Sequence, residues 1–508
     1  MSQRAGAGRV VVREWPAAPA AAAAFRRLAG EANPFFLDSS LPMPRWGRWS
    51  VVGGRPFLVL SSRGREIEER TRQGARRWRA DPFDALREAL ARFEAPDEGF
   101  PFAGGAAGFL SYDLGAFVER LPRTTLDDAG FPEMWFGFYD RAAVFDHEQG
   151  RAWLAAVELG GGAAGAETAE QKLADLARRL AGPAVARETG PACVSAVTSN
   201  FTRDKYLAAV ARAKRYIAAG DIFQVNISQR LHARIGVSPV ELYLRLREVN
   251  PAPYAAFLAF DDKAVLSSSP ELYLDLRGRR VVTRPIKGTR PRGATPAEDD
   301  RLKEELLASE KEKAELAMIV DLERNDLGRV CEYGSVRVTE PRVMEPYRRV
   351  WHGVATVEGT LREGMDRVDL LRAAFPGGSI TGAPKVRAME IIDELEPTRR
   401  SVYTGAIGWL GFEGGMALNV AIRTFLTRGQ DAFFQVGGGI VADSDEAAEY
   451  EETLHKAHGL MDSLGRAADD GERRPRMIAD DGERRRTEMA MVSGGRAEGD
   501  PDNHGRFV

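Results

Sequence analysis

A glycine-rich apolar strand followed at once by an acidic helix is the pattern that most restricts how this chain can fold. The strand is Val436–Ile440, and the helix predicted over 447–460 places Glu449, Glu452 and Lys456 on one face. Glycines let backbone N–H groups approach an anion closely. Two carboxylates beside such a loop suggest a hard cation, and Mg²⁺ prefers oxygen ligands. A solvated helix face with a weak ion pair is the alternative interpretation.

Composition and charge are those of an ordinary globular protein. Of 508 residues, 44% are hydrophobic and 29% charged, and the net charge of −3 indicates neither nucleic acid nor an anionic membrane as partner. Cys193 and Cys331 have no metal-ligand spacing and form no disulfide framework, so we expect a reducing cytoplasm. No apolar run reaches the ~20 residues that span a bilayer. The alanine-rich segment 17–24 is expected to begin a helix rather than a signal peptide.

The chain is predicted to contain two folded domains and a tail. The domains are residues 9–182 and 199–464, and the Gly-, Ala- and Pro-rich stretch 181–192 is the best boundary between them. Apolar residues at helical spacing predict a helix over 202–219. Residues 465–508 repeat the motif DDGERR and contain few large apolar residues, so they cannot offset their chain entropy. We therefore expect a disordered charged tail.

A second acidic and apolar segment, 311–330, offers a third oxygen donor in Glu315. Further on, the polar residues between Asp321 and Asp326 are at least as compatible with a capped helix end and a turn as with catalysis.

A Gly/Ser/Thr loop at 375–385 precedes a predicted helix. Prolines flank this loop, which is typical of a helix N-terminus, where exposed amides favour an anion. The order Gly-Lys-Ser/Thr of a Walker loop is absent. Arg423 supplies a fork that can bind a carboxylate with two hydrogen bonds, although an exposed arginine on a strand fits equally well.

An extended segment at 284–292 carries a lysine between an apolar residue and a glycine. Lys287 is either solvent-exposed or directed into a site, where burial near other cations would make its amine a nucleophile. Glu271 is a candidate proton donor, and His352 is either a packed histidine or an acid/base group.

Taken together, these segments resemble the chorismate-utilising enzymes, a family with an anthranilate branch and a para-aminobenzoate branch. The matching segments keep family order over about 260 residues. They are SNFTRDKYLAAVARAKRYIAAGDIFQVNISQR, SSSPELYL, PIKGTRPRG, AELAMIVDLERNDLGRV, FPGGSITGAPK, AIRT and VADSDEAAEYEETLHKA. The resemblance implies an α+β fold, an α/β sandwich with two large antiparallel sheets flanked by helices. The pieces PFAGGAAGFLSYDLG and FGFYDRAAVFDH extend it to the N-terminal domain.

The resemblance also implies roles for individual residues. Mg²⁺ would be held by Glu315, Glu449 and Glu452, directly or through water, and would bind the ring carboxylate of chorismate. The enolpyruvyl carboxylate would be held by Tyr403, Arg423 and Gly439, with Lys456 and Ser379 close by. Glu271 would act as general acid toward the C4 hydroxyl, and His352 would lie against the ring.

Lys287 distinguishes the two branches. The anthranilate branch resembles PIAGTRPRG here, whereas the para-aminobenzoate branch resembles PIKGT, as this chain does. The resemblance therefore implies amination of chorismate at C4 through a covalent lysine, with ammonia from a separate glutamine amidotransferase. Amination at C2 is the alternative. A non-catalytic regulator that binds chorismate or tryptophan is a more remote one, because the acidic site residues are all present.

The N-terminal domain resembles the tryptophan pocket of the same families. The resemblance implies that Ser39, Pro253 and Tyr254 line this pocket. Asp38 and Ala255 stand where the feedback-inhibited pattern usually has Glu and Met, which argues against feedback inhibition. Ordinary loop and core packing is the alternative.

Overall fold

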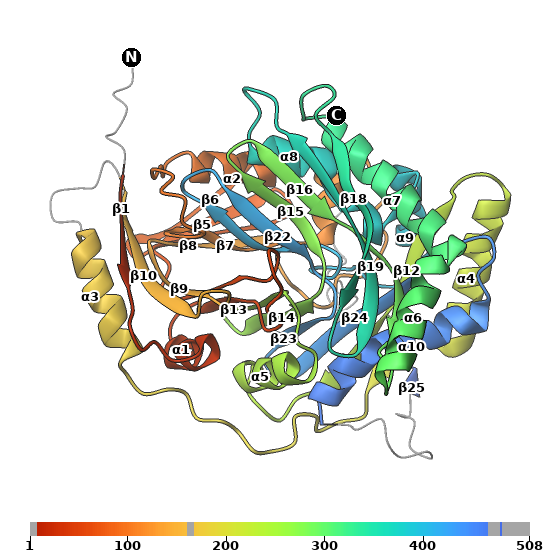
Figure 1. Ribbon diagram of the computed structural model, residues 1–508, viewed down its shortest axis with the longest axis horizontal. Coiled ribbons are helices and arrows are strands. Elements are labelled where there is room, and N and C mark those ends of the chain that lie inside the picture. Colours follow the sequence, from red (N-terminus) through yellow and green to blue (C-terminus); the bar gives the residue numbers. More distant parts are fainter. Residues whose placement is uncertain (1–7, 160–166, 466–477, 480–508) are drawn as a thin grey trace, which may run out of the picture.

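Two stacked, largely antiparallel sheets form the centre of the molecule in the computed structural model, which describes residues 8–159, 167–465 and 478–479 (Figure 1). The predicted fold class is confirmed. The first sheet runs through β1 (Arg9–Glu14), β10 (Arg151–Glu158), β9 (Arg141–Asp146), β3 (Trp49–Gly53), β2 (Phe35–Asp38), β13 (Tyr254–Phe260), β14 (Lys263–Ser269), β23 (Thr424–Arg428), β24 (Asp431–Ile440), β12 (Gln224–Arg234), β11 (Thr198–Ser199) and β25 (Ile478–Ala479), and β20 (Gly382–Ala383) pairs with β12.

The second sheet carries several of the predicted catalytic segments. It runs through β17 (Ile286–Pro291), β19 (Val350–Thr360), β16 (Arg280–Arg284), β15 (Leu272–Arg277), β22 (Met416–Val420), β21 (Ala406–Gly411), β7 (Gly105–Leu110), β8 (Met134–Tyr139), β4 (Leu58–Arg63), β5 (Glu66–Thr71) and β6 (Gly74–Arg79), and β18 (Arg337–Pro346) pairs with β19.

Helices cover the outer faces of both sheets. In Figure 1, α1, α5 and α10 lie along the lower side and α2 and α8 along the upper side. The α-helices are α1 (Ala21–Leu28), α2 (Pro82–Leu90), α3 (Ala169–Leu180), α4 (Arg203–Ala218), α5 (Pro239–Val249), α6 (Pro296–Ala308), α7 (Glu310–Gly328), α8 (Arg367–Ala374), α9 (Lys385–Leu395) and α10 (Glu446–Ser463), and the 3-10 helices are η1 (Tyr112–Phe117) and η2 (Gly378–Ile380).

Neighbouring residues on the central strands enter different layers of the core. Successive side chains of a strand point to opposite faces, so a strand buried on both sides carries a continuous apolar run. On β2, Phe35 lies between the sheets, whereas Phe36 faces α1 and stacks on Phe25 at 5.1 Å between ring centroids. Trp135 of β8 stacks on Phe260 of β13 at 4.8 Å and so joins the two sheets.

Each sheet contains a block of strands from each of the two predicted domains, joined side by side. In the first sheet β2 pairs with β13, so that Leu37 lies opposite Ala256. In the second, β7 pairs with β21 along its whole length. The boundaries predicted at 9–182 and 199–464 therefore divide the sequence but not the sheets. The predicted tail, 465–508, falls outside the described residues except for 465, 478 and 479.

Local signals predicted most site elements correctly, with one exception. The predicted helix over 202–219 is α4, capped by Thr202, and the loop at 375–385 leads into α9. Interpreting 321–326 as a helix end and turn is wrong, because α7 continues to Gly328. Asp321 and Arg324 form an exposed i, i+3 pair there at 2.9 Å, and Asp326 turns inward to Lys385.

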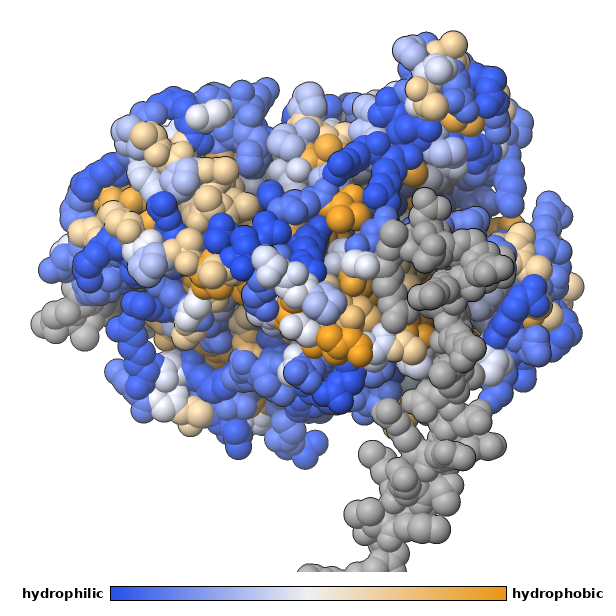
Figure 2. All heavy atoms as spheres, turned by 90° about the horizontal axis from the view of Figure 1, so that it is seen from below, coloured by the Kyte–Doolittle hydropathy of each residue, from blue (hydrophilic) through white to orange (hydrophobic). Residues whose placement is uncertain are grey.

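The surface is mainly polar on the face that Figure 2 shows, where hydrophilic side chains surround smaller hydrophobic patches. Among the described residues, no helix combines the length and apolar character needed to cross a membrane.

Candidate active site

Glu271 is a buried carboxyl held by a serine from the 375–385 loop. It directly precedes β15, is 5% exposed, and accepts a hydrogen bond at Oε1 from Ser379 Oγ at 2.6 Å. Burial raises the pKa of Glu271 to about 7, although the Ser379 hydrogen bond and the charges of Lys287 and Arg423 oppose this shift. A carboxyl with this pKa can carry a proton near neutral pH and give it up, as a general acid must.

Lys287 lies on β17, at a shift in the register between β17 and β19. Gly288 has φ +87°, and a Cβ on Gly353 of β19 would lie 2.7 Å from the Lys287 carbonyl oxygen, so glycine is needed at both positions. Burial lowers the pKa of the Lys287 amine, and so does the charge of Lys456. The opposing charges are those of Glu315, Glu271 and Glu452. More of the amine is therefore neutral, and nucleophilic, than in an exposed lysine.

His352 is a neutral imidazole facing the same site. Its Nε2 lies 3.3 Å from Arg423 Nη2 and its Nδ1 lies 3.0 Å from Thr289 Oγ1. Because a guanidinium can only donate, Nε2 accepts and Nδ1 carries the proton. Burial, and next the Arg423 charge, lower the pKa of His352 to about 3. The ring of Tyr347 packs against it edge to face at 4.8 Å between centroids.

Arg423 is a cation that pairs with no carboxylate of the described residues. It precedes β23 with a left-handed backbone (φ +51°), and burial lowers its pKa. Within residues 8–159 and 167–465 its guanidinium forms no ion pair, and His352 is its hydrogen-bond partner. Tyr403, which is 8% exposed, was predicted to act with it. Because cations withdrawn from water are normally paired, the unpaired fork of this half-buried arginine fits an anionic ligand.

The acidic face of α10 lies against the glycines of β24, as predicted. A Cβ on Gly438 would lie 2.8 Å from Glu449 Oε2 and 3.7 Å from Glu452 Oε1. Lys456 Nζ donates to the Gly437 carbonyl at 2.9 Å and pairs with Glu452 at 2.7 Å. Burial and the charge of Glu452 raise the pKa of Glu449, whereas for Glu452 the pair with Lys456 outweighs burial and lowers it.

Two features of this acidic pair fit a hard cation. Glu449 Oε2 is buried and has no hydrogen-bond partner in the described part of the chain, and the lack of a side chain at Gly438 lets this oxygen approach the strand closely. Glu315, on α7, is partly buried and interacts electrostatically with Glu452. The structure does not gather the three acids: among the described residues, no three His, Cys, Asp or Glu side chains are arranged to hold a metal ion.

Gln224 borders the site, although no sequence motif indicates a role for it. It begins β12, is fully buried, and neither its amide oxygen nor its amide nitrogen has a hydrogen-bond partner in the described structure. A Cβ on Gly439 would lie 2.9 Å from both Gln224 Nε2 and Asn226 Oδ1. Its side chain therefore borders the predicted carboxylate-binding glycine. A glutamine at the start of a buried strand was the only available signal.

The predicted tryptophan-pocket residues line one cavity of about 520 Å³. Ser39, Pro253 and Tyr254 all border it, and Ser39 Oγ lies 2.8 Å from the Trp49 carbonyl oxygen and 3.0 Å from that of Pro253. Asp38, also at its wall, is buried and pairs with Arg247 at 2.8 Å.

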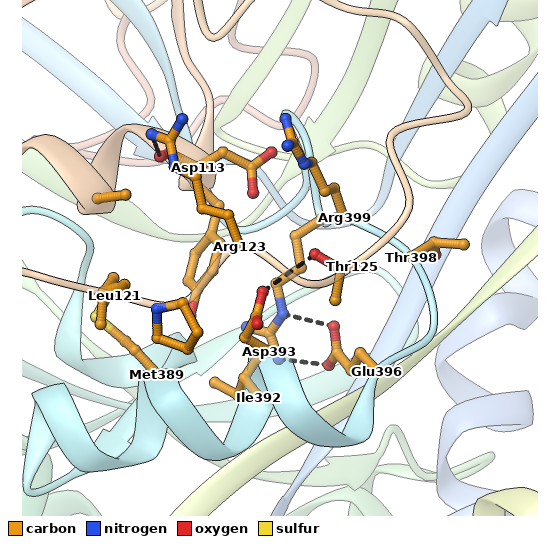
Figure 3. A pocket seen from close by; sticks show the side chains of 14 residues that line it. Asp113, Leu121, Arg123, Thr125, Met389, Ile392, Asp393, Glu396, Thr398 and Arg399 are labelled. Carbon is orange, nitrogen blue, oxygen red and sulfur yellow. Dashed lines mark hydrogen bonds and ion pairs between the residues drawn. The ribbon is translucent and has the colours of Figure 1, made fainter. Parts of the chain in front are cut away.

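A smaller cavity of about 40 Å³, lined in part by α9 and the residues after it, is shown in Figure 3. Its inner wall is the buried ion pair between Arg400 and Glu396, at 2.7 Å. Arg400 also donates to the carbonyls of Ile380 at 3.0 Å and Asn226 at 2.8 Å. The pair thus supports the backbone on both sides of the candidate site.

Comparison with known proteins agrees with this arrangement. A model of the chorismate binding enzyme family matches residues 50–462. An aminodeoxychorismate synthase component 1 from Bacillus subtilis is 42% identical over 462 residues, covering 86% of this chain and 97% of that protein. An anthranilate synthase component 1 from Thermus thermophilus is 44% identical over 453 residues, covering 87% and 94%.

A solved structure supports the same relationship. The crystal structure of anthranilate synthase component I from Streptococcus pneumoniae matches with a TM-score of 0.72 and 33% identity, covering 82% of this chain and 93% of that one. Because the family model spans most of the sequence and both relatives align over nearly their whole length, the chain belongs to the chorismate binding enzyme family.

Proposed function

We propose that the chain is an aminodeoxychorismate synthase component I, which aminates chorismate at C4 to give 4-amino-4-deoxychorismate, on the route to para-aminobenzoate and folate. The observation that carries the proposal is Lys287, a half-buried lysine whose amine has a lowered pKa and interacts electrostatically with the acid Glu271. The similarity to the Bacillus subtilis protein supports it.

The reaction proceeds by two displacements. The neutral amine of Lys287 attacks C2, both ring double bonds shift, and the C4–O bond breaks while Glu271 protonates the departing hydroxyl, which leaves as water. Ammonia then attacks C4, both double bonds shift back, and the bond between C2 and Lys287 breaks, which releases the lysine as a neutral amine. The Glu271 carboxylate recovers a proton from the new ammonium group. His352 lies against the ring and, being neutral, adds no charge beside Arg423.

The two carboxylates of chorismate are bound at separate places. Arg423, Tyr403 and Gly439 hold the enolpyruvyl carboxylate, with Lys456 and Ser379 nearby. Glu449 and Glu452 would hold Mg²⁺, and Glu315 would contribute from α7, directly or through water. When bound, Mg²⁺ supplies positive charge that neutralises the ring carboxylate and orients the substrate.

Ammonia reaches this chain from a separate glutamine amidotransferase, in keeping with the designation of both relatives as component 1. The unpartnered amide oxygen of Gln224 offers an acceptor for it. Tryptophan is the proposed ligand of the cavity around Ser39, Pro253 and Tyr254, and calorimetric titration of the purified chain tests this; no heat of binding would exclude it.

Anthranilate synthase is the second candidate, favoured by the 44% identity to the Thermus thermophilus protein. There ammonia would add to C2 directly, without a covalent lysine. Incubation of the purified chain with chorismate, Mg²⁺ and ammonium separates the two. We expect a product that an aminodeoxychorismate lyase converts to para-aminobenzoate, and direct formation of anthranilate would refute the C4 assignment.

A lysine variant tests the covalent step. We expect Lys287→Ala to lose about a hundredfold or more of its C4-amination rate, because no other described amine replaces the nucleophile. Lys313→Ala, which removes a lysine whose side chain is 63% exposed, is the matched control and should keep its rate. Full C4 amination by Lys287→Ala would contradict the mechanism, and mass spectrometry of stopped reactions identifies the product.

A further inference from the structure

Helix α7 holds the loop that carries Ser379 near both of its ends. At the far end, Lys385 pairs with Asp326 and also donates to the Ala374 carbonyl at 2.9 Å. At the near end, Glu323 Oε1 accepts a hydrogen bond from the Gly378 N–H at 3.2 Å. The next residue, Ser379, is the one that donates to Glu271. The position of α7 therefore determines where the serine hydroxyl lies.

The turn at Gly378 sits directly against α7. A Cβ at this glycine would lie 2.6 Å from Leu322 Cδ2 and 3.3 Å from Glu323 Oε1, so any side chain here would displace the end of Leu322. The backbone N–H of Gly378 begins η2 and needs an acceptor from outside that helix. Glu323 provides it.

Glu323 occupies this position at an energetic cost. It is 2% exposed, and its second oxygen, Oε2, is buried without a hydrogen-bond partner in the described structure. Burial, reinforced by the charge of Asp326, raises the pKa of Glu323 to about 8, so the carboxyl is protonated at neutral pH. An apolar side chain would avoid this cost, which indicates that the Gly378 contact is the reason for an acid here.

We propose that Glu323 is a positioning residue for the general acid: by holding the Gly378 amide, it sets the turn from which Ser379 donates to Glu271. The inference rests on the proposed function only in taking Glu271 as the proton donor. It adds a residue that touches neither substrate nor metal and acts through Ser379.

Losing the Glu323 contact should change the pKa of Glu271 in a definite direction. The hydrogen bond from Ser379 lowers the pKa of Glu271 against the effect of burial, so weakening that bond raises it. The charged groups facing Glu271 are Lys287, Arg423 and Glu323, and those facing Glu323 are Asp326, Lys385, Glu271 and the Tyr273 hydroxyl. Because Glu323 is protonated near pH 7, removing it takes away no charge there.

Four variants test the proposal. Glu323→Met keeps the volume but offers Gly378 no comparable acceptor, Glu323→Asp withdraws the carboxyl by one methylene, Glu323→Gln keeps a carbonyl acceptor, and Ser379→Ala removes the hydroxyl itself. The measurement is kcat/KM for chorismate consumption against pH, at saturating Mg²⁺ and constant free ammonia. The limb of this profile near pH 7 reports the pKa of Glu271 in the free enzyme.

We expect Glu323→Met, Glu323→Asp and Ser379→Ala to move that limb upward by similar amounts, about one pH unit, and to lower kcat about tenfold. Glu323→Gln should keep both the position of the limb and kcat at their wild-type values. Combining Glu323→Met with Ser379→Ala should shift the limb no further than Ser379→Ala alone, because the two residues act in series.

Other outcomes would overturn the proposal. A Glu323→Met or Glu323→Asp enzyme that loses thermal stability yet keeps the wild-type limb would show a merely structural role. Additive shifts in the double variant, or a Glu323→Gln enzyme that behaves like Glu323→Met, would do the same. Failure of the proposed function is separately visible: anthranilate as product refutes C4 amination but leaves this inference standing, and a wild-type chain that consumes no chorismate refutes both.

Discussion

At the scale of single residues, burial determines the chemistry of the candidate site more than residue type does. Desolvation raises the pKa of the acid Glu271 and lowers those of the bases Lys287 and His352. The sequence indicated these three residues as candidates for the site. It did not indicate Gln224 or Glu323, because a sequence does not show whether a glutamine or glutamate is buried or whether its polar atoms find hydrogen-bond partners.

A pH profile follows from these shifts. The first displacement needs Glu271 protonated and Lys287 neutral at once, so kcat/KM should fall at both low and high pH. One limb should lie near pH 7, the pKa of Glu271, and the other should lie below 10.5, the ordinary pKa of lysine, because burial lowers that of Lys287. Chorismate consumption at constant free ammonia measures the profile. A rate that stays level from about pH 6 to 8 would contradict it.

At the scale of elements, local signals were sufficient to predict a helix or strand wherever a capping residue or a glycine run marks its end. Thr202 caps α4 and Asp445 caps α10 with their side chains, and both helices were predicted. The prediction for α7 is wrong because its polar residues at 321–326 suggest a helix end. Their partners are distant in sequence: Asp326 contacts Lys385, and Glu323 contacts Gly378. Such tertiary pairing cannot be inferred from one sequence.

The contact between β24 and α10 makes a prediction about the metal. In Gly438→Ala the new Cβ would lie 2.8 Å from Glu449 Oε2, so this carboxylate must shift from its position. We expect the Mg²⁺ concentration for half-maximal activity to rise about tenfold, because disturbing the groups that hold a metal weakens its binding. Magnesium titrations of the chorismate-consumption rate measure it. Gly328→Ala, where nothing lies within 4 Å, is the matched control. An unchanged Mg²⁺ requirement in Gly438→Ala would argue against this metal site.

At the scale of the whole molecule, the order of the strands within each sheet could not be predicted from the sequence. Single strands such as β3 and β24 could be predicted from apolar runs, but no local pattern indicates that β2 pairs with β13 or that β7 pairs with β21. These pairings join residues more than 200 positions apart and place Trp135 on Phe260 between the sheets. The segment that carries the catalytic residues thus depends for its core on the segment before it.

Two truncations test this dependence. A chain of residues 199–464 keeps every proposed catalytic residue but loses β2 and β7, which leaves β13 and β21 with unpaired edges and Phe260 without Trp135. We expect it to aggregate or to unfold without a cooperative transition, as followed by near-ultraviolet circular dichroism and thermal melting. A chain of residues 1–464 lacks only the predicted charged tail, keeps both pairings, and should consume chorismate at the rate of the full chain. An active, cooperatively folded 199–464 fragment would show that the two predicted domains are independent, and an inactive 1–464 chain would show that the tail contributes to the fold.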